Sequence, residues 1–128
     1  MPSWDEVREY AREKYNLQEE TDRSFKLVWE YRNGRFQMIT VSRFEAIDRE
    51  WVDFVSAACK REQLDPEEAL RRNYTFAQGA LCLDGDVYVV RYSSLLATMD
   101  MDEFELPLHI VAQTADELEA ELTKSDDF

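Results

Sequence analysis

Histidine and cysteine, the residues that most often build metal centres and nucleophile sites, are scarce in this chain. His109 is the only histidine, and Cys59 and Cys82 are too far apart to form a CxxC pair. A zinc site draws about four ligands from such residues, so we expect neither a histidine cluster nor an HExxH site. His109 should have a structural or surface role. The two cysteines should be buried thiols and not a disulfide.

Carboxylates are abundant, but none of them falls in a catalytic or metal-binding motif. Asp84-Gly85-Asp86 lacks the regular acidic spacing and the distal glutamate of an EF-hand, so we expect a hairpin turn there. Asp100 and Asp102 are expected to cap a helix. GxGxxG, GxxxxGKS/T and GxSxG are all missing from the sequence. We therefore expect a protein that is not an enzyme and that needs no metal and no cofactor.

The charge of the chain restricts its partners. The formal net charge is −13, and residues 97–128 carry ten acids against one base, whereas residues 21–96 are nearly balanced. A surface of this kind repels nucleic-acid phosphates and anionic lipid head groups, which argues against nucleic-acid binding. It suits contact with a basic partner.

Length and composition indicate one domain covering residues 1–128. The chain has 128 residues, of which 45% are hydrophobic and 12% aromatic, enough for a core without disulfides or metals. No run approaches the roughly 20 apolar residues that span a bilayer, so we expect no membrane insertion. The first residues, Met1-Pro2-Ser3-Trp4, do not resemble a signal peptide. A cytoplasmic location is the expectation that follows.

Three helices are predicted from capping residues and helical spacing. Ser3 and Glu6 have the spacing of a capping box, and Asp65-Pro66 combines a cap with proline at the first helical position. The last helix is expected over residues 102–123, where Pro107 should bend the first turn or delay the start. Its apolar stripe steps by three and four residues: Phe104, Leu108, Val111, Ala115, Leu118 and Leu122.

Five strands are predicted between these helices. Alternation after Phe25 and the dipeptide Asn33-Gly34 predict a hairpin with a two-residue type I′ turn. A third strand is expected at Glu50–Ser56 and a second hairpin around Asp84-Gly85. The order is therefore α-β-β-β-α-β-β-α, an α+β fold in which helices pack on an antiparallel sheet. The first turn would place on one face the cross-strand pairs Tyr31–Phe36, Trp29–Met38 and Leu27–Thr40.

The aromatic residues of the first hairpin have two interpretations. Trp29, Tyr31, Phe36 and Met38 could line a peptide-binding surface, or they could be the core face of a sheet under helices. A second apolar run, at Leu95, Leu96 and Met99, could pack under the last helix or contribute to an interface. The sequence leaves both alternatives open.

Several motifs together resemble a known fold. They are residues 37–44 (QMITVSRF), 64–70 (LDPEEAL), 79–81 (GAL) with 84–86 (DGD), and 111–118 (VAQTADEL). With the element order, these resemble the type III secretion chaperone-like fold, which the Tir chaperone (CesT) family shares with YbjN-like proteins. The likeness covers nearly the whole chain and involves structural motifs only.

The resemblance implies a small, acidic chaperone-like protein that holds an extended segment of a client polypeptide. The alternative is a regulatory or scaffold protein of the YbjN-like type that binds a folded partner. The resemblance also implies a homodimer, and four apolar residues around the middle helix and second hairpin are its candidate interface: Leu70, Tyr74, Phe76 and Val89.

Overall fold

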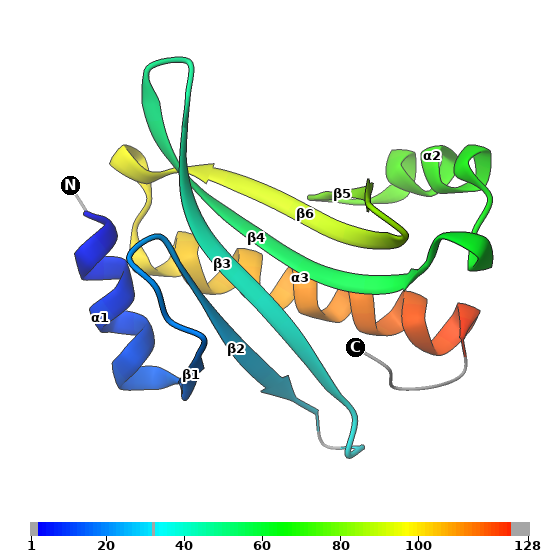
Figure 1. The fold of residues 1–128 in the computed structure, drawn as a ribbon, viewed down its shortest axis with the longest axis horizontal. Coiled ribbons are helices and arrows are strands. Elements are labelled where there is room, and N and C mark those ends of the chain that lie inside the picture. Colours follow the sequence, from blue (N-terminus) through cyan, green and yellow to red (C-terminus); the bar gives the residue numbers. More distant parts are fainter. Residues whose placement is uncertain (1–2, 32, 124–128) are drawn as a thin grey trace.

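The computed structural model describes residues 3–31 and 33–123 as a six-stranded antiparallel sheet and three helices. The strand order is β1-β2-β3-β4-β6-β5, and α3 runs along one face of the sheet (Figure 1). The helices are α1 (Trp4–Lys14), α2 (Pro66–Thr75) and α3 (Met101–Leu122). The strands are β1 (Leu17–Gln18), β2 (Ser24–Glu30), β3 (Phe36–Ala46), β4 (Arg49–Lys60), β5 (Ala80–Asp84) and β6 (Val87–Leu95).

The predicted α+β class and element order are confirmed, with one addition. The two-residue strand β1 is not among the five predicted strands, and in it Leu17 pairs with Leu27 of β2. Leu17 packs against the core, and this burial supports a strand that is too short to be recognised from the sequence. Within the described residues, no helix is both long and apolar enough to cross a bilayer.

The helices begin where the capping residues predicted. In each helix a side-chain oxygen accepts a first-turn N–H, and the pairs are Ser3 with Glu6 (3.2 Å), Asp65 with Glu67 (3.2 Å) and Asp100 with Glu103 (2.8 Å). Pro107 does not delay α3, because the helix already begins at Met101. Pro107 removes only one hydrogen bond from the helix. The buried apolar side chains of α3 form most of the core that the helices contribute, and their burial outweighs this loss.

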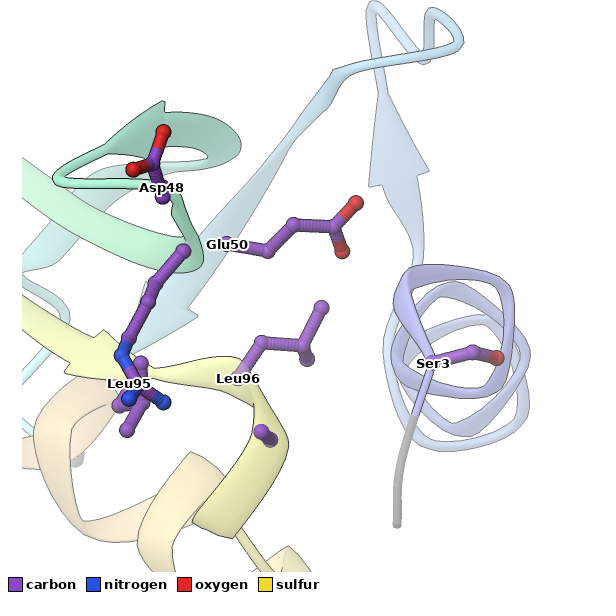
Figure 2. A pocket seen from close by; sticks show the side chains of 7 residues that line it. Ser3, Asp48, Glu50, Leu95 and Leu96 are labelled. Carbon is purple, nitrogen blue, oxygen red and sulfur yellow. The ribbon is translucent and has the colours of Figure 1, made fainter.

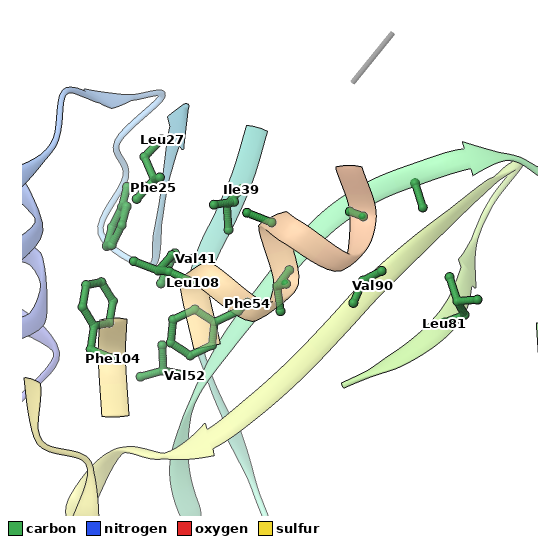
Figure 3. Packing of buried hydrophobic residues seen from close by; sticks show 14 of the residues in the cluster. Phe25, Leu27, Ile39, Val41, Val52, Phe54, Leu81, Val90, Phe104 and Leu108 are labelled. Carbon is green, nitrogen blue, oxygen red and sulfur yellow. The ribbon is translucent and has the colours of Figure 1, made fainter. Parts of the chain in front are cut away.

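The core lies between the sheet and the layer formed by α1 and α3, and we call this side of the sheet the inner face. Figure 3 shows side chains of the sheet and of α3 meeting there. Leu96 and Met99 are buried in the chain, which favours the packing interpretation for that run. The largest fully buried side chains include Phe25, Leu27, Ile39, Phe54, Phe104 and Leu108.

The predicted register of the first hairpin is wrong by one residue. The Tyr31 N–H donates to the Arg35 carbonyl (2.8 Å), so three residues and not two separate the paired ends, and Gly34 takes the positive φ of 85°. Consequently Trp29 pairs with Gln37, and Val28 pairs with Met38. A one-residue change of register moves side chains to the opposite face, so Trp29 and Met38 lie on different faces.

The turns of the other two hairpins were predicted only in part: no turn was predicted between β3 and β4, and the second predicted turn is displaced by one residue. Ile47 and Asp48 connect β3 to β4 with φ of 54° and 56°, the positive pair of a type I′ turn, although neither is glycine. Left-handed backbone costs about 1–2 kcal/mol at such residues. In Figure 1 this hairpin projects beyond the rest of the sheet. The β5–β6 turn is centred on Gly85-Asp86, one residue later than expected.

Candidate functional site

The four predicted peptide-binding residues lie on both faces of the β2–β3 hairpin. Trp29 is half-buried on the inner face, with its ring 5.3 Å from that of His109 on α3. Tyr31 also lies towards α3, where burial and then the carboxylate of Asp116 raise its pKa. Phe36 and Met38 are 46% and 37% exposed on the opposite face of the sheet, which we call the open face. The structure thus separates Trp29 and Tyr31 from Phe36 and Met38.

An exposed apolar patch nevertheless forms on the open face. Met38 pairs across the strands with Val28, which is also 37% exposed, and Phe36 lies two residues away on the same side. We call Val28, Phe36 and Met38 the hairpin patch. Exposed apolar side chains scattered singly are ordinary, but three neighbours on one sheet face are typical of a contact surface.

On the side away from β3, one end of β2 has no neighbouring strand among the described residues. On the side away from β3, strand β1 pairs only with Leu27 and Lys26, so Val28–Glu30 have no partner strand there among the described residues. Neighbouring residues of an antiparallel strand direct their backbone groups to opposite sides. Since the Tyr31 N–H points towards β3, the N–H and C=O of Glu30 point outwards.

The opposite edge of the sheet is largely closed. The side-chain amide of Asn73 on α2 accepts a hydrogen bond from the Leu81 N–H (2.6 Å) and donates one to the Leu81 carbonyl (3.4 Å). This amide occupies the position that a further strand would take beside β5. An incoming strand would therefore find more free edge at the end of β2 than at β5.

A groove lies on the inner side of the same hairpin. Its volume is about 440 Å³, and we call it the Trp29 groove. Leu106 contributes an apolar side chain that is 53% exposed, away from the buried stripe of α3. The groove is lined by Trp29, Asp102, Glu105, Leu106 and His109. Apolar walls with a few polar groups at the rim are typical of sites that bind side chains or small ligands.

The two carboxylates of the groove differ in their surroundings. Glu105 accepts hydrogen bonds from Tyr10 (2.7 Å), Lys14 (2.7 Å) and Tyr15 (3.0 Å). Burial alone would raise its pKa, but these donors together lower it. Burial, and then the hydrogen bond to Glu105, raise the pKa of Tyr15 to about 12. Glu105 therefore ties α1 to α3, whereas the exposed carboxylate of Asp102 has no ion pair among the described residues.

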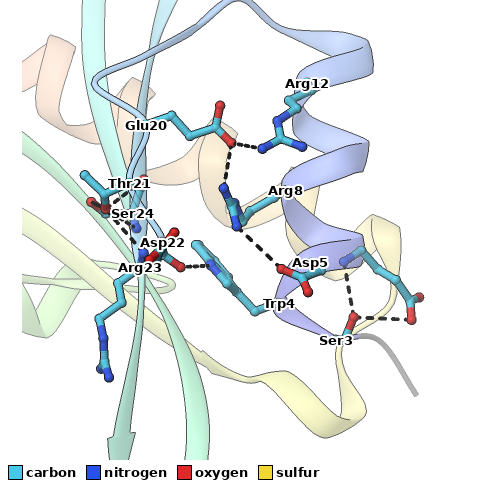
Figure 4. A network of polar contacts seen from close by, with 11 residues as sticks. Ser3, Trp4, Asp5, Arg8, Arg12, Glu20, Thr21, Asp22, Arg23 and Ser24 are labelled. Carbon is cyan, nitrogen blue, oxygen red and sulfur yellow. Dashed lines mark hydrogen bonds and ion pairs between the residues drawn. The ribbon is translucent and has the colours of Figure 1, made fainter.

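The polar network at the N-terminal end is structural. In Figure 4 the Trp4 indole donates to the Asp22 carbonyl (2.9 Å), and Arg8 and Arg12 both contact Glu20. The hydrogen bond from Arg12 is the main cause that lowers the pKa of Glu20. These contacts fasten α1 to the segment that leads into β2. A concavity of about 360 Å³ beside them is lined by charged side chains that are paired with one another, Arg8 with Asp5 (3.5 Å) and Arg43 with Glu50 (2.7 Å).

Another concavity offers no recognisable chemistry. Its volume is about 420 Å³, and it lies beside the turn end of the β3–β4 hairpin, where Asp48 and Glu50 line it together with Leu95 and Leu96 (Figure 2). Ser3 also lines it, but the Ser3 hydroxyl already caps α1. Cys59 and Cys82 are free thiols; Cys59 is buried, as expected, but Cys82 is partly exposed. Across residues 3–31 and 33–123, no cluster of histidine, cysteine and acidic side chains could hold a metal ion.

The candidate dimer residues are only partly available on the surface. Leu70 and Tyr74 on α2 are 70% and 93% exposed. Val89, in contrast, is buried within the chain, and Phe76 packs against the core. Leu70 and Tyr74 are therefore the most accessible of the four, Phe76 is partly exposed, and Val89 is not available to another molecule.

Sequence reasoning missed three residues of the Trp29 groove, namely Asp102, Glu105 and Leu106. Asp102 was assigned to capping, and Glu105 was one acid among many. Leu106 did carry a signal, because it is an apolar residue outside the stripe of the last helix. Comparison with models of protein families finds no matching family, and comparison with curated proteins finds no significant relative.

Proposed function

We propose that this protein is a non-enzymatic, chaperone-like module that holds an extended segment of a client polypeptide beside β2. The observation that carries the proposal is the end of β2, where Val28–Glu30 have no strand on the side away from β3 among the described residues. An extended peptide that adds to such an edge gains backbone hydrogen bonds with little demand on its sequence. Its alternate side chains would contact the two faces of the sheet in turn.

Apolar surface on both sides of this edge supports the same function. On the open face the hairpin patch offers Val28, Phe36 and Met38, and on the inner side the Trp29 groove offers Trp29 and Leu106. Successive side chains of an added strand would contact the hairpin patch and the Trp29 groove in turn. The resemblance to secretion chaperones and YbjN-like proteins, inferred from the sequence, agrees with this binding mode.

The charge of the protein favours a basic client. A net charge of −13 should speed the encounter with a basic segment, and salt should weaken that effect. The proposal includes a cytoplasmic location and a protein that works without metal or cofactor.

Strand addition predicts that Glu30→Pro will weaken peptide binding about tenfold. Proline removes the outward N–H of Glu30 and obstructs the edge, while the β2–β3 hydrogen bonds remain. The probe is a fluorescein-labelled nine-residue peptide with alternating apolar and polar residues and a net positive charge. Fluorescence anisotropy measures its Kd, and circular dichroism melting checks that each variant is folded.

Glu30→Gln is the matched control, because it removes the same charge but keeps the N–H, and its Kd should stay within about twofold. Met38→Ser is a second variant that leaves the backbone intact, and it should weaken binding about threefold through the hairpin patch. Equal affinities for Glu30→Pro and Glu30→Gln would refute strand addition. The absence of any peptide binding to the unaltered protein would refute the proposed function itself.

A regulatory or scaffold protein that binds a folded partner is the second candidate. Ile47 favours it, since this residue is 87% exposed at the tip of the projecting hairpin and has left-handed backbone. Strained residues cluster at functional sites more often than elsewhere. Limited proteolysis of a captured partner separates the two functions, because a client held as an extended segment is cut readily whereas a folded partner resists.

A homodimer belongs to the proposal and is supported by the exposed pair Leu70 and Tyr74 on α2. Light scattering at high micromolar concentration should give twice the chain mass of 15.2 kDa. Replacing both residues by serine should return the protein to the monomer mass, since two-fold symmetry removes each contact twice. A monomer mass for the unaltered protein at that concentration would contradict the dimer.

A further inference from the structure

The Trp29 groove combines apolar walls with one carboxylate, that of Asp102, which pairs with no side chain of the described residues. Trp29 and Leu106 present aromatic and aliphatic surface, and Asp102 lies one helical turn before Leu106 on α3. The His109 ring contacts the Trp29 ring edge-on at 5.3 Å, which restricts the orientation of the indole. The groove is therefore amphipathic along its length.

The fold engages Glu105 and leaves Asp102 available. Glu105 is held by Tyr10, Lys14 and Tyr15, and Lys14 already balances its charge. In the part of the chain that the structure describes, the Asp102 carboxylate makes no hydrogen bond and no ion pair. A cation that enters the groove would thus meet one unbalanced negative charge, at Asp102.

We propose that the Trp29 groove is a specificity pocket for an arginine side chain of the bound segment. The methylene stem would pack on Trp29 and Leu106, and the guanidinium would pair with Asp102. Long basic side chains bury their stems on apolar surface while the charged head stays at the rim. Arginine fits better than lysine because its planar guanidinium makes bidentate contacts with carboxylates and stacks on aromatic rings.

This inference rests on the proposed function and specifies the client further. The client segment should be extended, with an arginine directed to the α3 side of the hairpin. Apolar residues that alternate with the arginine would face the hairpin patch, since successive side chains of a strand point to opposite faces. The expected client pattern is thus an arginine between two apolar residues.

The test measures four complexes by fluorescence anisotropy. Two labelled nine-residue peptides differ only at the central position, which is arginine or glutamine, with valine on either side. The unaltered protein should bind the arginine peptide about fivefold more tightly than the glutamine peptide. This ratio corresponds to the largest free energy that exposed ion pairs usually contribute. Asp102→Asn should abolish that preference, and the glutamine peptide should bind both proteins equally.

Glu103→Gln is the control variant. Glu103 is also exposed in the first turn of α3, so its replacement causes the same change in net charge and helix-dipole interaction but leaves the groove lining intact. It should keep the preference for arginine. If Glu103→Gln and Asp102→Asn reduced the preference for the arginine peptide equally, that preference would come from long-range charge alone. The proposed arginine pocket would then be wrong.

A leucine peptide separates the remaining outcomes. If leucine at the central position binds as tightly as arginine and Asp102→Asn has no effect, the arginine pocket is wrong while strand addition stands. If none of the peptides binds, both the pocket and the proposed function fail. Double-mutant analysis of the four arginine and glutamine complexes gives the coupling between Asp102 and the arginine directly.

Discussion

Phe104→Ala is expected to lower the free energy of unfolding by about 4 kcal/mol, the largest effect of any single substitution considered for this chain. Phe104 is fully buried at the centre of the core. Its ring lies 5.8 Å from the ring of Phe54 on β4 and 5.8 Å from that of Tyr10 on α1. Truncation would therefore leave a cavity at the junction of the sheet with both helices.

Urea denaturation followed by circular dichroism measures this loss. Leu106→Ala is the matched control, because Leu106 is in the same helix and is 53% exposed. Its cost should stay below about 1 kcal/mol. Similar costs for the two variants would mean that the side of α3 that bears Phe104 does not form the core. Since a domain of this size is stable by about 5–15 kcal/mol, Phe104→Ala should remove between about a quarter and most of the stability of the fold.

Arg35→Met is expected to cost about 3 kcal/mol of stability. The Arg35 guanidinium donates to Asp116 (2.9 Å) and to Glu119 (3.1 Å), both on α3. Glu119 is completely buried, and removing the cation from a buried carboxylate is far more costly than breaking a surface pair. Methionine keeps most of the side-chain volume, so the loss reports mainly on charge.

Two comparisons separate this ion pair from general surface electrostatics. Arg91→Met removes a more exposed partner of Asp53, and it should cost less than about 1 kcal/mol in the same urea assay. Combining Arg35→Met with Glu119→Leu should recover much of the lost stability, because an apolar pair often replaces a buried ion pair without loss. If Arg35→Met costs no more than Arg91→Met, the contact between the hairpin and α3 is not energetically important.

The amino-acid sequence determined most of the local structure of this protein. Ser3, Asp65 and Asp100 cap helices in both prediction and structure, because capping depends on side chains within a few residues of each other. The stripe from Phe104 to Leu118 is buried as its spacing predicted. Gly34 and Gly85 both lie in turns and take positive φ, although the two hairpins differ by one residue from their predicted pairing or turn. The α+β class follows from these local patterns.

Only the tertiary structure decided which side chains share a face. Asn33-Gly34 favours a two-residue turn, but the hairpin closes around three residues. Contacts distant in sequence accompany this register: Arg35 reaches Glu119, and the buried amide of Gln37 donates to Ser56 (2.9 Å). The difference in free energy between neighbouring registers is small locally, so contacts of this kind can select between them. The predicted patch of Trp29 and Met38 was divided for this reason.

Local sequence patterns did not predict the candidate site either. Trp29 was recognised as a candidate from its residue type, but its neighbours Asp102 and Leu106 come from a helix more than 70 positions later. Periodicity assigns a residue to a face of its own helix or strand, and it carries no information on which other element that face meets. The open end of β2 depends in the same way on the short strand β1, whose two residues pair with β2 while Leu17 packs, partly buried, against the core. The elements were therefore local properties of the sequence, whereas the groove and the free edge arose from the way the core packs.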